Sequence, residues 1–191
     1  MEQIRKALFA LKMDVLRKRQ LLAQLESLRE QEQALQQREI AEAAQAGCDA
    51  QQAADAILQE LDDVASLGVR DLLGGGLLVT MAKHDHLDAA QNLVEQLQIK
   101  LRNFKTELAD VSIGVNLQMQ VDGFLYFADY FFDGIFADLA VQNHIEEQQR
   151  QIHQLKQQID VVLGTLETMG TDLEQQKQQL QQSRNRLALR C

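Results

Sequence analysis

Two pairs of polar residues near the middle of the chain have the spacing that a helical metal site would need. His84 and Asp88 are four residues apart, and so are Asp129 and Asp133. Residues four apart lie on the same face of a helix, so two facing helices would offer one imidazole and three carboxylates. Such a ligand set suits Zn²⁺, Mn²⁺ or Fe²⁺. One hypothesis is therefore a metal-binding head that could also be catalytic.

The same residues also fit a buried polar network without a metal. Asp129 and Asp133 stand among aromatic residues, and buried carboxylates require partners. Lys83, His84 or Arg102 could provide them. The Glu-x-x-His motif of helical di-iron proteins is not present in the sequence. We favour the network, so no cofactor is expected, with a divalent metal as the alternative.

A run of three glycines, Gly74, Gly75 and Gly76, is a second candidate site. Before a helix, the backbone N–H groups of such a run could bind an anion. The sequence contains neither G-x-x-x-x-G-K-[ST] nor G-x-G-x-x-G, so we favour a helix-packing or hinge role. His86, further along, is expected to face solvent.

The nucleophilic residues do not form a recognisable catalytic set. Neither Cys48 nor Cys191 has a histidine or basic neighbour that would activate it, and no hydrolase triad is found. Two cysteines are too few for a disulfide framework, which favours a cytoplasmic protein. Residues 1–10 have no long apolar run, so no signal peptide is expected. We expect a protein that is not an enzyme.

The glycine run, the Lys83-His84 pair with Asp88, and the segment Phe-Ala-Asp-Tyr-Phe-Phe-Asp-Gly at 127–134 resemble a family of uncharacterised bacterial helical, coiled-coil proteins. The resemblance covers residues 68–145. Relatives often carry Trp where Leu139 stands in this chain. No activity is attached to the family, so the resemblance implies a recurring helical module and no particular reaction.

The elements that must position these residues are organised around a C-terminal arm, residues 145–187. An aliphatic residue recurs there at every seventh position: Ile145, Ile152, Ile159, Leu166, Leu173, Leu180 and Leu187. Between them stand Leu155, Val162 and Met169. This heptad pattern predicts a coiled-coil seam, which requires a partner helix.

Residues 2–46 are expected to form the partner helix. The chain contains no proline, and an apolar stripe with a spacing of three and four, interrupted by Lys18, begins this segment: Ile4, Leu8, Leu11, Val15, Leu22 and Leu25. Gly47 is the expected stop. Helix lengths of about 68 and 65 Å suggest that the two arms pair antiparallel within one chain. The alternative is a parallel dimer in which each arm pairs with a second chain.

Between the arms, the pattern predicts a compact head. Helices are expected at 49–67 and at 87–111, the second with a clear apolar stripe. Alternation with period two at 113–121 indicates an extended segment. Seven of the nine aromatic residues fall in 124–136 and surround a helix on all sides, which is typical of a buried element.

The net charge of −9 is unevenly distributed. Residues 1–20 hold six basic and two acidic residues, and residues 177–191 hold four basic and none acidic. In an antiparallel stalk these ends would meet in a basic tip that includes Arg5, Lys6, Lys12, Arg17, Lys18, Arg19, Arg184, Arg186 and Arg190. Such a tip could touch nucleic acid, an anionic membrane or an acidic head. With Phe9 as its one stacking aromatic, nucleic acid is not expected, and solvated helix ends are the simpler interpretation.

The sequence therefore predicts a mostly all-α protein with a long antiparallel two-helix coiled-coil stalk and a compact helical head. The arms are residues 1–46 and 145–191, the head is 47–144, and one short extended segment lies at about 113–121. We expect a non-enzymatic interaction or assembly protein that binds a protein partner or itself, as a homo-oligomer. The alternatives are the metal-binding head and a membrane-associating head, the latter using the Gly- and Phe-rich segments and not favoured.

Overall fold

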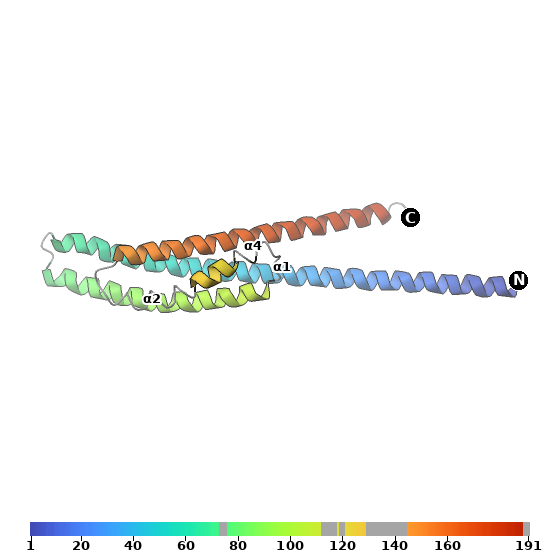
Figure 1. The fold of residues 1–191 in the computed structure, drawn as a ribbon, viewed down its shortest axis with the longest axis horizontal. Helices are drawn as coiled ribbons and strands as arrows, with labels where there is room; N and C mark the ends of the chain where they lie inside the picture. Colours follow the sequence, from blue (N-terminus) through green and yellow to red (C-terminus); the bar gives the residue numbers. More distant parts are fainter. Residues whose placement is uncertain (73–75, 112–117, 119–120, 129–144, 189–191) are drawn as a thin grey trace. The chain divides into compact units, whose positions relative to one another are not determined.

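The computed structural model of this protein describes residues 1–72, 76–111, 118, 121–128 and 145–188, with side chains for all of these except 67–72, 76–84, 87, 187 and 188. Three long helices stand out: α1 (Glu2–Leu72), α2 (Gly76–Asp110) and α4 (Ile145–Ala188) (Figure 1). Residues 121–128 are also helical. Within these described ranges the structure contains no β-strand, so the predicted all-α fold class is confirmed.

The chain divides into two compact units, Met1–Arg38 and Glu39–Cys191, and α1 contributes to both. The first unit is one helix, as expected from a proline-free segment rich in Leu, Gln, Arg and Glu. Its polar surface carries pairs at i and i+4, Lys6 with Glu2 and Lys18 with Asp14, each at 3.4 Å. Such pairs stabilise a helix by a few tenths of a kcal/mol each. The predicted division of the chain into two arms and a head stays a prediction.

In the second unit, α1 and α4 are antiparallel. Three polar pairs join them: Gln51 with Asp160, Lys156 with Asp55, and Gln149 with Asp62. Residue numbers rise along α1 as they fall along α4, which fixes the direction. The expectation that residues 2–46 supply the partner of this part of α4 is wrong, because these contacts are made by residues 51–62 of α1.

The helix α2 is also antiparallel to α1. Lys100 lies 2.9 Å from Asp49, and His86 lies 2.7 Å from Glu60 further toward the C-terminal end of α1. The hydrogen bond from Lys100 is the main reason why the pKa of Asp49 is lowered. Because α2 and α4 both oppose α1, they run in the same direction alongside it (Figure 1).

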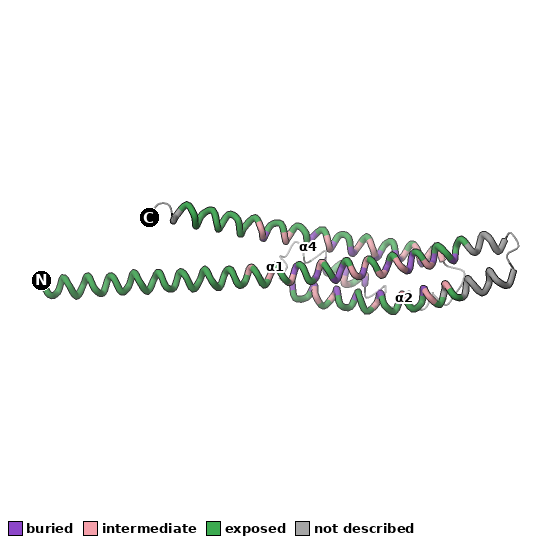
Figure 2. The backbone as a smooth tube through the Cα atoms, turned by 180° about the vertical axis from the view of Figure 1, so that it is seen from behind, coloured by how far each residue is buried: buried purple, intermediate pink, exposed green. Residues whose placement is uncertain are grey.

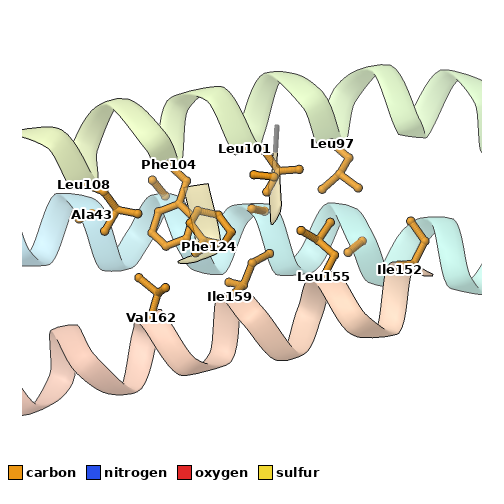
Figure 3. Packing of buried hydrophobic residues seen from close by; sticks show 14 of the residues in the cluster. Ala43, Leu97, Leu101, Phe104, Leu108, Phe124, Ile152, Leu155, Ile159 and Val162 are labelled. Carbon is orange, nitrogen blue, oxygen red and sulfur yellow. The ribbon is translucent and has the colours of Figure 1, made fainter. Parts of the chain in front are cut away.

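The core of the second unit is formed by buried residues of α1, α2 and α4 (Figures 2 and 3). Each helix contributes large apolar side chains, and those of α1 include the fully buried Ile57 and Leu61. Along α1, four buried alanines recur at a spacing of three and four: Ala43, Ala46, Ala50 and Ala54. Small side chains let neighbouring helices approach closely, and the larger ones fill the remaining space. Phe104 of α2 and Phe124 are both fully buried, with ring centroids 5.1 Å apart and a tilted geometry that aromatic pairs favour.

Two predicted apolar patterns are confirmed by burial. The predicted stripe is buried on α2 at Ala90, Val94, Leu97, Leu101, Phe104 and Leu108, and at Val111, the residue that follows the end of α2. On α4, the heptad positions are buried at Ile152, Leu155, Ile159, Val162, Leu166 and Leu173. Toward the C-terminal end of α4 the heptad positions are no longer buried, since Leu180 is 51% exposed.

Gly47 does not stop the first helix, so that prediction is wrong. The helix α1 continues through it to Leu72. Without a proline nearby, one internal glycine weakens a helix by only about 1 kcal/mol. Here glycine leaves room for the packing, because a Cβ atom at position 47 would lie 2.7 Å from Leu163 Cδ2 and 3.0 Å from two ring carbons of Phe104.

The predicted extended segment at 113–121 falls mostly outside the described residues. Gln118 and Val121 are described and are helical, so the prediction is wrong at those two positions. Of the aromatic segment 124–136, Phe124 is buried as predicted, whereas Tyr126 is exposed. The rest of that segment beyond residue 128 lies outside the described residues.

Candidate functional site

The site predicted from the sequence falls largely outside the described part of the chain. That holds for Gly74, Gly75, Asp129 and Asp133, and for the side chains of Lys83 and His84. Gly76 is the first residue of α2. Asp88 is described and exposed, and its carbonyl oxygen accepts a hydrogen bond from Asn92 at 3.0 Å. The metal or network role of these residues stays a prediction.

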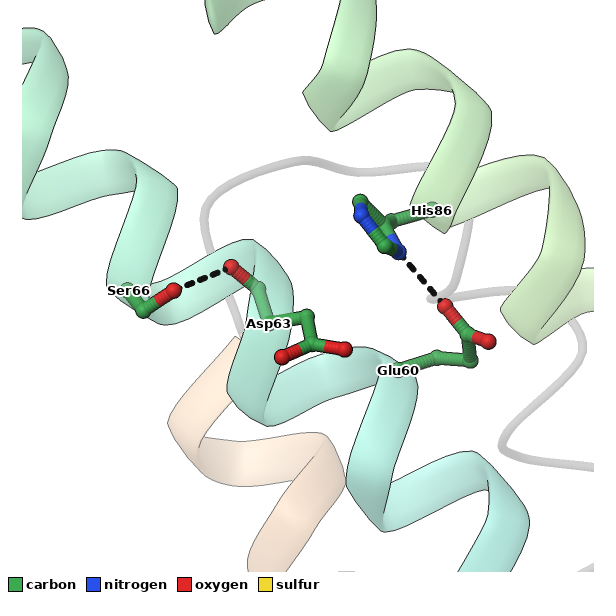
Figure 4. Close-up of polar contacts among 4 residues, drawn as sticks. All are labelled: Glu60, Asp63, Ser66 and His86. Atoms are coloured by element: carbon green, nitrogen blue, oxygen red, sulfur yellow. Dashed lines mark hydrogen bonds and ion pairs between the residues drawn. The ribbon is translucent and has the colours of Figure 1, made fainter.

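The structure brings a different set together, Glu60, Asp63 and His86 (Figure 4). Glu60 and Asp63 are three residues apart on α1, a spacing that puts both side chains on one face of a helix. His86 stands on the facing α2. Because α1 and α2 are antiparallel, a residue soon after the start of α2 lies beside the last turns of α1.

The contact between the two helices at this point is short and partly shielded from water. The Nδ1 atom of His86 lies 2.7 Å from Oε2 of Glu60. The two side chains are 36% and 27% exposed, whereas Asp63 is exposed. One ligand atom from each of the three residues lies within 4.8 Å of the others. Ser66 donates a hydrogen bond at 2.8 Å to the backbone carbonyl of Asp63, so this bond does not involve the side-chain carboxylate of Asp63.

The electrostatics of this cluster favour a positive charge on the imidazole. The hydrogen bond to Glu60 is the main cause of a raised pKa for His86, and the negative charges of Glu60, Asp63 and Asp85 add to it. Partial burial acts in the opposite direction. The contact between His86 and Glu60 therefore joins α1 to α2, and the raised pKa of His86 strengthens it wherever the imidazole is protonated.

His86 was expected to face solvent, and its side chain is indeed partly exposed, but its ring also contacts Glu60 of α1. A sequence signal existed: Glu60 and Asp63 share a face of the predicted 49–67 helix. Folding that helix back on the next one around the glycine run would bring residues near 86 opposite residue 60. The spacing of four residues between His84 and Asp88 had instead indicated a site that contains His84.

The second candidate surface is the apolar stripe of the first unit, here called the N-terminal stripe: Ile4, Leu8, Leu11, Val15, Leu22 and Leu25. These side chains are 44–68% exposed. Exposed apolar residues at helical spacing are typical of a face that packs against another helix. The N-terminal stripe therefore has the chemistry of a docking surface for a helix.

The basic residues at the two ends of the chain are exposed where they are described. Those in the first unit are Arg5, Lys6, Lys12, Arg17, Lys18 and Arg19, and those near the end of α4 are Arg184 and Arg186. Arg190 lies outside the described residues. A single basic stalk tip would combine residues of both units, and it stays a prediction.

Comparison with family models, with curated proteins and with solved structures found no match to this chain. The resemblance of residues 68–145 to a helical family therefore stays a prediction. Among the described residues, none of the helices combines the length and the apolar character that a bilayer crossing requires.

Proposed function

We propose that this protein is a non-enzymatic helical assembly module that self-associates through its N-terminal stripe. The observation that carries the proposal is the exposure of six aliphatic side chains at regular helical spacing on residues 4–25. In contrast, the second unit uses the corresponding faces of α2 and α4 for its own core. The stripe is therefore the part of the described chain whose apolar pattern calls for a partner helix.

The size of the stripe suits a reversible assembly. Complete burial of a Val, Leu or Ile side chain contributes about 1.5–3 kcal/mol. Because these side chains are 44–68% exposed, covering the remainder contributes on the order of 1 kcal/mol each. Two stripes together contribute on the order of 10 kcal/mol, while association itself costs about 4–15 kcal/mol. Self-association is therefore expected to depend on protein concentration.

A second copy is a better partner for the stripe than the C-terminal end of the same chain. Residues 174–186 contain one large aliphatic residue, Leu180, which is too little to cover six. Residues 177–191 carry four basic and no acidic residues, and residues 1–20 carry six basic and two acidic. Pairing these two ends would bring like charges together, which is unfavourable.

Charge also favours an antiparallel arrangement of the two copies. Residues 1–20 have a net charge of +4, whereas residues 21–38 hold two basic and three acidic residues. Antiparallel pairing of the two stripes sets Arg5 and Lys6 of one helix near Glu26 of the other. Parallel pairing would set the two basic halves side by side.

The opposite face of the same helix extends this interpretation. Phe9, Met13 and Leu16 form a second, shorter apolar row and are also about half or more exposed. A helix that is apolar on two faces is covered best by more than one neighbour. Assemblies of more than two helices are therefore compatible with the proposal, and two copies are its minimum.

The assembly is proposed to form in the cytoplasm. Cys48 is a free, exposed thiol, and such thiols persist in compartments that keep cysteines reduced. The proposed partner is a second copy of this chain, and the proposal involves neither nucleic acid nor a membrane.

Sedimentation equilibrium on the full chain and two matched variants tests the proposal. Leu22→Glu places a negative charge within the stripe, between Val15 and Leu25. Ala23→Glu places the same charge one position further along the helix, outside the stripe and next to Arg19 and Ser27. The unmodified chain and Ala23→Glu are expected to show at least twice the chain mass, and Leu22→Glu the mass of a single chain.

Two results would overturn the proposal. The first is a single-chain mass for the unmodified protein at all concentrations up to the millimolar range. The second is the same degree of association for Leu22→Glu and Ala23→Glu. Circular dichroism on all three proteins confirms that the helix content is unchanged.

A further inference from the structure

The cluster of Glu60, Asp63 and His86 has the composition and placement of a metal site between two helices. We propose that these three side chains bind a divalent cation of the zinc class and link α1 to α2. The proposal rests on the second unit alone and is independent of self-association through the N-terminal stripe. It also differs from the sequence-predicted set, which used His84 and not His86.

The geometry needs only small side-chain movements to accept the ion. In a tetrahedral zinc site with bonds of about 2.0–2.2 Å, neighbouring ligand atoms lie roughly 3.3 Å apart. The three ligand atoms already lie within 4.8 Å of one another, and His86 Nδ1 and Glu60 Oε2 are 2.7 Å apart. The His–Glu pair must therefore open by about 0.6 Å, and Asp63 must close by at most about 1.5 Å. All three side chains are at least partly exposed and have room to rotate.

The ligand types select the class of metal. One imidazole nitrogen and two carboxylate oxygens suit zinc and its neighbours, whereas Ca²⁺ and Mg²⁺ prefer six or more oxygen ligands. Three protein ligands leave a fourth position for water. Asp85, whose charge acts on His86, adds a negative potential that favours a cation.

The ligands come from two helices, so binding would act on the fold. Glu60 and Asp63 belong to α1, and His86 belongs to α2. An ion that binds all three joins the helices only in the folded state, and such a ligand raises the stability of that state. The expected role is a metal clip on the α1–α2 pair.

Isothermal titration with Zn²⁺ alone tests the site on the full chain. All proteins compared carry Cys48→Ser and Cys191→Ser, so that thiolates do not compete for the metal. In this background, His86→Ala and Glu60→Gln each remove one ligand. His153→Ala is the matched control, because His153 is an exposed histidine on α4, outside the cluster. His84→Ala separates the proposed site from the sequence-predicted one.

The parent protein, His153→Ala and His84→Ala are expected to bind one Zn²⁺ per chain with equal affinity. His86→Ala and Glu60→Gln are expected to lose at least about tenfold in affinity, since even an outer-shell change costs about 10–100-fold. Thermal unfolding gives a second readout: Zn²⁺ should raise the Tm of the parent and leave that of His86→Ala unchanged.

The proposal would be overturned if the parent protein bound no Zn²⁺, or if His86→Ala lowered the affinity for Zn²⁺ no more than His153→Ala does. A loss of affinity in His86→Ala without a loss in Glu60→Gln would contradict it as well. Loss on His84→Ala with retention on His86→Ala would also overturn it, in favour of the sequence-predicted site.

Discussion

Replacing two glycines by alanine should change stability in opposite directions, because one of them is packed and the other is not. At position 47 a Cβ atom would lie 2.7 Å from Leu163 Cδ2 and 3.0 Å from two ring carbons of Phe104. At position 164 it would meet nothing within 4 Å. Both glycines are inside long helices, so the backbone effect of the substitution is the same at both.

The magnitude follows from two opposing contributions. Alanine is favoured over glycine in a helix interior by about 0.5–1 kcal/mol. Overpacking a core by one carbon costs about 1–3 kcal/mol. Leu163 can move, but Phe104 is fully buried against Phe124, so we expect the steric cost to be larger. Gly47→Ala should lower the free energy of unfolding by about 1 kcal/mol, and Gly164→Ala should raise it by about 0.5–1 kcal/mol.

Urea unfolding followed by circular dichroism measures both changes. The proteins must be compared at one concentration, because an assembly that favours the folded state makes stability depend on concentration. Gly47→Ala as stable as the unmodified protein, or more so, would refute the packing role of Gly47. A loss of stability in Gly164→Ala would show that the backbone reasoning itself is wrong.

Two further predictions concern the packing of α4 and the contact between α1 and α2. Leu166→Ala should lower the free energy of unfolding by about 2–5 kcal/mol, since Leu166 is buried. Leu180→Ala should change it by no more than about 0.5 kcal/mol, because Leu180 is 51% exposed. Equal losses of stability in urea unfolding would contradict this difference. In the metal-free protein, the pKa of His86 should lie above its ordinary value of 6.5, mainly through the hydrogen bond to Glu60. The stabilisation is then complete below pH 6.5 and is lost as the pH rises through the higher folded-state pKa. Titration by NMR should show a lower His86 pKa in Glu60→Gln, and equal values in both proteins would contradict the assignment.

The sequence predicted best those features that depend on local periodicity. The stripe from Ala90 to Val111 is buried as expected, and so are the heptad positions from Ile152 to Leu166 and Leu173. Each pattern repeats over several helical turns, so it determines which face is apolar whatever the partner is. The period-two pattern at 113–121 was short, and the helical Gln118 and Val121 show that alternation over so few residues is a weak guide.

The features that failed depend on residues distant in the sequence. Gly47 carries the signal of a helix end, yet its role is decided by Leu163 and Phe104, which no local pattern reveals. The partner of α4 was assigned by matching helix lengths. The actual contacts of α4 are made to residues 51–62 of α1, and they depend on how the buried side chains of α1, α2 and α4 fit together.

The cluster of Glu60, Asp63 and His86 could not be predicted from the sequence for the same reason. Its members were visible as residue types, but a spacing rule within one helix cannot join Glu60 and Asp63 to His86 on the next. Predicting them requires the α1–α2 register. Lys100 with Asp49 and His86 with Glu60 show that register in the structure.

Hydrogen exchange of the backbone amides in residues 4–25 tests the central claim most directly. An isolated helix in water opens readily, because its stability comes mainly from packing of its apolar face. Protection of these amides should therefore rise with protein concentration in the unmodified chain and in Ala23→Glu, and should be lost in Leu22→Glu. Protection that is the same at every concentration, or equal in the two variants, would contradict assembly through the N-terminal stripe.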